Sequence, residues 1–158
     1  MVLSLVAHLT AIVGCGNPNR SDDGVGPYVA SLLTEKGLGS DVAIFDAGTD
    51  GMGVMYQARG CQRLIIVDAQ APESNPGAIY EVPGEVLERP PNDSLNLHDF
   101  RWDNALYAGR KIYGDDFPSD VTVLLIEAKS LEMGLELSSE VKAAGQSVAD
   151  RIESLCKP

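Results

Sequence analysis

The chain has 158 residues, which is enough for one ordinary domain with a hydrophobic core and too few for two comfortable ones. Lys and Arg number 12 against 23 Asp and Glu, and the resulting net charge of −11 disfavours nucleic acids and anionic lipid surfaces as partners. We therefore expect one domain over residues 1–158, without membrane insertion, whose partners are proteins, cations or small molecules.

The cysteines indicate a reducing compartment. Cys15, Cys61 and Cys156 are odd in number, widely spaced and free of any Cys-x-x-Cys pattern. This spacing argues against a disulfide framework and against a structural zinc site. We expect reduced thiols and a cytoplasmic protein.

Apolar runs of strand length alternate with helix-like stretches along the chain. The predicted strands are Val6–Val13, Val42–Phe45, Leu64–Val67 and Val121–Ile126, with Ala78–Val82 as a possible edge strand before Pro83. The predicted helices are Val25–Lys36, Gly53–Arg59, Asp99–Tyr113 and a terminal helix over about 138–155. The stretches Leu64–Val67 and Val123–Ile126 are apolar at every position, as strands covered on both faces require. The sequence therefore predicts an α/β fold, a single three-layer domain with a twisted, mainly parallel sheet between helices.

A glycine-rich segment follows the first predicted strand and runs from Gly14 to Gly26. It contains four glycines and the adjacent carboxylates Asp22 and Asp23, a composition typical of a functional loop. The alternative is that Ser21 or Asp22 only caps the following helix. A dinucleotide fingerprint is excluded because Asn19 stands where its last glycine belongs, and no Walker-type Gly-Lys-Ser/Thr follows.

Further polar residues follow the other predicted strands. Ligands gather beyond the carboxyl ends of parallel strands, so these residues are site candidates. They are Asp46 and Asp50 after the second strand, Asp68 after the third and Glu127 after the fourth. Taken singly, Asp46 equally fits an Asx turn and Asp68 a strand-ending turn.

His98 lies between a predicted proline-rich loop, Glu88–Leu97, and a predicted helix. A lone histidine is more often structural than a ligand. Together with Asp23 and Asp68, however, it would give two carboxylates and one imidazole, an open ligand set that suits a divalent transition ion. No Gly-x-Ser-x-Gly elbow occurs and no histidine is evidently placed to activate Cys15, so hydrolysis by an activated water fits better than a nucleophilic side chain.

Four motifs occur in the order found in the hydrogenase maturation proteases. They are Gly14-Cys-Gly-Asn-Pro-Asn-Arg-Ser-Asp-Asp-Gly-Val-Gly26, Asp46-Ala-Gly-Thr-Asp-Gly-Met52, Leu64-Ile-Ile-Val-Asp-Ala69 and His98. The chain resembles this family over most of its length. The resemblance implies the same twisted, largely parallel sheet between helices, of the phosphorylase/hydrolase-like type.

The resemblance also implies an activity. Members of the family are endopeptidases that remove a C-terminal extension from the large-subunit precursor of nickel-iron hydrogenases after nickel insertion. The residues that contact nickel match Asp23, Asp68 and His98, and the metal is expected to be the substrate's rather than a resident cofactor. Asp46 matches an acidic motif residue, although Ala47 replaces the first glycine after it, and is expected to orient or activate water.

Two other functions compete with this one. A nickel-sensing chaperone that binds the precursor without cutting it would use the same three residues. The Gly-x-Gly-Asn-Pro opening also resembles peptidyl-tRNA hydrolase, but the Thr-Arg-His-Asn segment of that enzyme is absent and a net charge of −11 is poorly suited to a tRNA partner.

Overall fold

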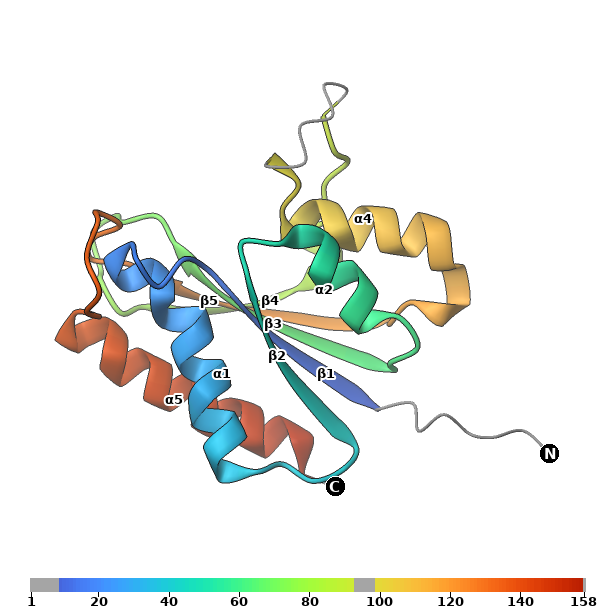
Figure 1. Ribbon diagram of the computed structural model, residues 1–158, viewed down its shortest axis with the longest axis horizontal. Coiled ribbons are helices and arrows are strands. Elements are labelled where there is room, and N and C mark those ends of the chain that lie inside the picture. The colour runs from blue at the N-terminus through green and yellow to red at the C-terminus, as the bar shows by residue number, and fades with distance from the viewer. Residues whose placement is uncertain (1–8, 93–98, 158) are drawn as a thin grey trace.

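A single sheet in the order β2-β1-β3-β5-β4 forms the centre of the molecule (Figure 1). The structure is a computed structural model that describes residues 9–92 and 99–157. Its strands are β1 (Thr10–Cys15), β2 (Val42–Gly48), β3 (Arg63–Gln70), β4 (Ile79–Pro83) and β5 (Asp120–Glu127). Strands β2, β1, β3 and β5 pair in parallel, whereas β4 pairs antiparallel with β5 at the edge of the sheet.

Helices cover both faces of the sheet. Helices α1 (Val25–Lys36) and α5 (Ser139–Cys156) pack together on one face, and α2 (Gly51–Ala58) and α4 (Trp102–Tyr113) pack on the other (Figure 1). Shorter elements are the 3-10 turns η1 (Ser21–Gly24) and η3 (Gly114–Asp116) and the helix α3 (Gly84–Leu87). The predicted three-layer α/β architecture is confirmed.

Successive residues of the central strands face opposite layers. Ile12 and Ile65 are buried with the side chains of α1 and α5, whereas Val13 and Ile66 are buried with those of α2 and α4. All four are fully buried. The strands need an apolar residue at every position because both sides of the sheet are covered, which is why they read as continuous apolar runs.

The predicted boundaries differ from the observed ones mainly at the ends of elements. Helix α1 has the predicted bounds, and the predicted edge strand is present as β4. Strand β1 begins at Thr10 among the described residues, and the start of the predicted Val6–Val13 run lies outside them. The helix predicted from Asp99 begins only at Trp102, because Arg101 is extended with a ψ of 178°.

Helix α5 shows how a sequence pattern becomes packing. Ser138 is its N-cap, and the Ser138 hydroxyl accepts a hydrogen bond from the Val141 amide. Val141, Val148 and Ile152 are buried at helical spacing against α1 and the sheet. The remaining faces of α5 are polar.

None of the helices in the described residues is long and apolar enough to span a membrane.

Helix α1 approaches the sheet very closely at its first turn. A Cβ atom on Gly26 would collide with the backbone of Cys15, at the end of β1, and with the carbonyl oxygen of Val67 in β3. A Cβ on Gly14 would in turn collide with the backbone of Gly26. These two glycines therefore set the distance between α1 and the strand ends that carry the candidate site.

We expect Gly26→Ala to lower the free energy of unfolding by about 3 kcal/mol, because the added methyl group meets backbone atoms that have no rotamer to change. Urea denaturation followed by circular dichroism measures this change. The exposed Ser31 on the same helix supplies the control, since Ser31→Ala should alter stability by less than about 0.5 kcal/mol. Equal stabilities for the two variants would contradict the close approach.

Candidate functional site

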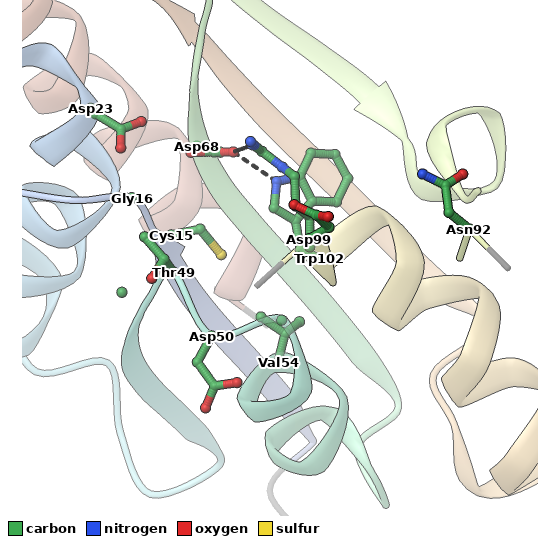
Figure 2. A pocket seen from close by; sticks show the side chains of 13 residues that line it. Cys15, Gly16, Asp23, Thr49, Asp50, Val54, Asp68, Asn92, Asp99 and Trp102 are labelled. Atoms are coloured by element: carbon green, nitrogen blue, oxygen red, sulfur yellow. Dashed lines mark hydrogen bonds and ion pairs between the residues drawn. The ribbon is translucent and has the colours of Figure 1, made fainter. Parts of the chain in front are cut away.

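A cavity of about 500 Å³ opens at the carboxyl ends of β1, β2 and β3 (Figure 2). Its wall includes Cys15, Asp23, Thr49, Asp68, Arg101 and Trp102. The parallel strands β1, β2 and β3 end at the same edge, so residues far apart in the sequence meet there. The structure thus brings Asp23 and Asp68 to one cavity, as their positions after two predicted strands suggested.

Asp23 is positioned by the glycine-rich segment. It lies in η1, and its Oδ2 accepts a hydrogen bond of 2.7 Å from the Asn17 amide. Gly16 has a φ of +133°, and a Cβ at Gly16 would collide with the Asp23 carbonyl oxygen. This turn therefore requires glycine at position 16 in order to hold the Asp23 carboxylate at the cavity wall.

The neighbouring Asp22 has a structural role. It is 1% exposed, and its carboxylate accepts hydrogen bonds from the amides of Lys129, Ser130 and Ser138 and from the Ser138 hydroxyl. Capping of α1 by Ser21 or Asp22 is not observed, because the N-cap is Gly24 and no side chain caps it. Asp22 instead fastens the connection between β5 and α5 to η1.

Asp68 is the most deeply buried carboxylate of the cavity wall, with its side chain 4% exposed. Its Oδ2 accepts hydrogen bonds from Trp102 Nε1 at 2.7 Å and from Arg101 Nη2 at 3.1 Å (Figure 2). Its Oδ1 accepts one from the Ala69 amide at 2.8 Å. Burial raises the pKa of Asp68 to about 6, although the Trp102 hydrogen bond and the Arg101 charge both lower it.

Of the two carboxylates that follow the second predicted strand, only one lies on the cavity wall. Asp46 is exposed, its Oδ1 accepts a hydrogen bond from the Gly48 amide, and it is not part of the cavity wall. This is the Asx-turn arrangement that the sequence left open for it. Asp50, in contrast, lies on the cavity wall and caps α2 by accepting a hydrogen bond from the Gly53 amide.

Glu127, the candidate after the last parallel strand, serves as a loop anchor. It is 1% exposed, and its Oε2 accepts hydrogen bonds from the amides of Glu73 and Asn75. Its Oε1 accepts one from the Tyr80 hydroxyl. Glu127 therefore holds the loop before β4 and takes no part in the cavity wall.

Cys15 contributes an uncharged thiol to the cavity wall. Burial, and then the charge of Asp68, raises its pKa well above the usual value, although the Arg101 charge opposes this. A thiol with a raised pKa is a poor nucleophile at neutral pH. This agrees with the expectation that Cys15 is not activated.

His98, the third predicted metal contact, lies outside the described residues. Within residues 9–92 and 99–157, no three side chains of His, Cys, Asp or Glu are grouped closely enough to hold a metal ion. The described part of the site therefore offers Asp23 and Asp68, together with Asp50 and Asp99, as oxygen donors around the cavity.

Arg101 and Trp102 were missed by the sequence analysis. Both lie inside the helix that was predicted from Asp99, and their contacts with Asp68 span 33 and 34 residues. A pattern of helical periodicity contains no signal for such pairs. Only their position three and four residues after His98, in the first turn of a predicted helix, sets them apart in the sequence.

We expect Asp22→Ala to lower the free energy of unfolding by about 3 kcal/mol, because it leaves buried amide donors without an acceptor. Denaturation by urea measures the loss. The adjacent half-buried Asp23 accepts a single amide, so Asp23→Ala should cost about 1 kcal/mol. Comparable losses in the two variants would contradict the structural role of Asp22.

The raised pKa of Asp68 predicts how the stability of the fold depends on pH. A carboxyl whose pKa is higher in the folded state than in the unfolded chain stabilises the fold below the unfolded pKa, near 4, and this contribution is lost as the pH rises through about 6. Between pH 5 and 7.5 the loss amounts to about 1.4 kcal/mol. The isosteric variant Asp68→Asn lacks this titration, so its stability relative to the unsubstituted protein should rise by that amount. A difference in urea-denaturation free energies that is constant over this range would contradict the shift.

Comparison with known proteins places the chain in one family. A model of the hydrogenase maturation protease family (HycI) matches residues 27–155, which is more than half of the chain. The hydrogenase 2 maturation protease of Escherichia coli is 27% identical over 134 residues, covering 84% of this chain and 80% of the relative. The coenzyme F420 hydrogenase subunit delta of Methanothermobacter thermautotrophicus is 29% identical over 155 residues, covering 89% and 92%. A relative from Methanocaldococcus jannaschii is 32% identical over 90 residues, a match that spans 56% of this chain and 58% of the relative.

Solved structures agree with these matches. The hydrogenase 2 maturation peptidase from Thaumarchaeota archaeon SCGC_AB-539-E09 superposes with a TM-score of 0.70 at 27% identity, covering 92% of this chain and 96% of that one. The nickel-iron hydrogenase maturation protease HybD from Thermococcus kodakarensis superposes with a TM-score of 0.73 at 26% identity, covering 94% and 99%. The chain therefore belongs to the hydrogenase maturation protease family, a family of peptidases.

Proposed function

We propose that this protein is an endopeptidase that removes the C-terminal extension of a nickel-iron hydrogenase large-subunit precursor after nickel has been inserted. The observation that carries the proposal is the meeting of Asp23 and Asp68 in one cavity at the strand ends, in a chain of this family. The name of a relative from Thermococcus kodakarensis specifies nickel-iron hydrogenase, which supports this substrate class.

In the proposed mechanism the nickel is part of the substrate. Asp23 and Asp68 supply carboxylate oxygens, and His98 supplies an imidazole nitrogen, to the metal of the bound precursor. Carboxylate and imidazole are ligands that nickel accepts. A precursor without nickel leaves these side chains unpaired, so binding discriminates the loaded precursor from the empty one.

Hydrolysis follows once the metal contact has positioned the extension. A water molecule adds to the scissile carbonyl carbon, the peptide C–N bond breaks, and the leaving amine takes a proton. We assign Asp46 to orienting or activating that water. Asp46 is not part of the cavity wall, so in this assignment it acts on the water from outside the wall. The raised pKa of the buried Cys15 thiol favours water over a thiolate as the attacking group.

The proposal also covers the cellular compartment of the protein, its partner and its domain organisation. The free cysteines Cys15, Cys61 and Cys156 are compatible with a reducing cytoplasm, where the precursor is assembled in this proposal. The net charge of −11 favours a protein partner over a nucleic acid. Residues 1–158 act as one unit in which the sheet edge holds the site.

A second candidate is a nickel-sensing chaperone that binds the precursor without cutting it. One relative is named as a subunit of coenzyme F420 hydrogenase rather than as a protease. The same cavity would serve such a function, with Asp23, Asp68 and His98 contacting nickel. The two candidates differ in whether the precursor loses mass.

Intact-mass spectrometry of a large-subunit precursor, with and without nickel, tests the proposal. We expect loss of a C-terminal peptide only from the nickel-loaded precursor. Asp68→Asn should slow this cleavage about 100-fold or more, because the carboxylate charge that faces the metal is removed. The exposed Asp115, which is not part of the cavity wall, provides the control variant Asp115→Asn, which should cleave at the unsubstituted rate.

Each alternative outcome has a distinct meaning. A stable nickel-dependent complex with unchanged precursor mass would favour the chaperone. Cleavage by Asp68→Asn at the control rate would remove Asp68 from the mechanism. Cleavage of the nickel-free precursor would contradict the proposed role of the metal.

A further inference from the structure

Three donors hold the Asp68 carboxylate in this structure, two of them at Oδ2. Oδ2 accepts from both Trp102 Nε1 and Arg101 Nη2, and Oδ1 accepts from the Ala69 amide. A side chain that contacts the metal of a substrate needs a free lone pair that points into the cavity. A metal that contacts Oδ2 therefore has to replace one of the two donors there, Trp102 Nε1 or Arg101 Nη2.

The two side-chain donors differ in their freedom to move. Trp102 is 9% exposed and belongs to the hydrophobic core under α4, so its indole is fixed. The Arg101 side chain is 65% exposed and lies at the cavity wall. The guanidinium is thus the donor that can leave without disturbing the core.

The backbone of Arg101 is anchored independently of its guanidinium. The Arg101 amide donates to Asn104 Oδ1 at 3.1 Å, and the Arg101 carbonyl oxygen accepts from the Ala105 amide at 2.9 Å. These contacts fix the start of α4 whatever the side chain does. Movement of the guanidinium is therefore a side-chain event that leaves the fold unchanged.

Repulsion between the Arg101 guanidinium and a metal dication is the reason for the guanidinium to leave Asp68. Guanidinium has N–H donors only and stays positive at all relevant pH values, so it cannot share a carboxylate oxygen with a metal dication without repulsion. The cavity wall also carries Asp23, Asp50 and Asp99, so the displaced cation remains in an anionic setting.

We propose that Arg101 is a resident counter-cation of Asp68, which the nickel of the substrate displaces when the precursor binds. Arg101 is then a specificity-determining residue, because a precursor without a metal brings no cation to take its place. This inference rests on the proposed function only in the assignment of Asp68 as a nickel contact.

Calorimetric titration of the isolated protein with nickel(II) at pH 7.5 tests the proposal without any precursor. Arg101→Gln removes the competing cation and should bind nickel about tenfold more tightly than the unsubstituted protein. Arg101→Lys keeps the charge and should remain close to the unsubstituted affinity.

Arg110 supplies a matched control. It also lies in α4, and its Nε donates to Glu88 Oε2 at 2.9 Å. Arg110→Gln changes the net charge by the same amount and removes the same kind of ion pair, but away from the cavity wall. It should leave the nickel affinity within about twofold of the unsubstituted protein, since long-range effects of one exposed charge are screened by salt.

A second comparison ties the effect to the carboxylate. In an Asp68→Asn background, Arg101→Gln should no longer change the nickel affinity, because the ion pair is already absent. Equal nickel affinity of Arg101→Gln and Arg110→Gln, weaker binding by Arg101→Gln, or no measurable binding by either variant would overturn the proposal. Failure of the unsubstituted protein to cut the precursor would instead count against the proposed function, because the calorimetric comparison does not depend on cleavage.

Discussion

The hydrogen bond from the Trp102 indole to the buried Asp68 carboxylate is the contact on which the arrangement of the site depends. A carboxylate buried at the end of β3 must have donors, since an unpaired one would cost several kcal/mol. Trp102 supplies one at 2.7 Å and so fixes the first turn of α4 against the strand end. Asp99 and Arg101 are then held at the cavity wall. In the described residues every buried side-chain nitrogen and oxygen has a partner, which agrees with a tightly defined edge.

Three buried carboxylates near this edge have different uses, although each follows or lies beside a strand end. Asp22 and Glu127 accept chiefly main-chain amides, which belong to loops and cannot leave without unfolding them. Asp68 accepts one main-chain amide, one fixed indole and one exposed guanidinium. Among these three, Asp68 is therefore the carboxylate with a partner that can be exchanged for a substrate group.

The fold could be predicted because its main determinant is local. Strands apolar at every position imply a covered parallel sheet, and the stripe on α5 implies a packed helix. Because the carboxyl ends of parallel strands meet at one edge of a sheet, the sequence also predicted that Asp23 and Asp68 lie at the same edge.

The roles of individual carboxylates depend on long-range contacts: the donors of Asp22 lie 107 to 116 residues away, and Arg101 lies 33 residues from Asp68. The start of α4 was also predicted three residues early, because nothing in the periodicity signals the extended Arg101. The residue types alone suggested a divalent transition ion, and the resemblance to a known family added the expectation that this ion is nickel and belongs to the substrate.

The charges around the cavity give a physical reason for selectivity under the proposed function. Asp23, Asp50, Asp68 and Asp99 line the wall, with Arg101 as the cation among the charged residues described there. A metal dication carried by the substrate relieves the repulsion between these carboxylates, whereas a peptide without metal must displace an existing ion pair and offers no charge in return. A deep peptide pocket is then unnecessary, because the metal itself distinguishes the loaded precursor from the empty one at the cavity wall.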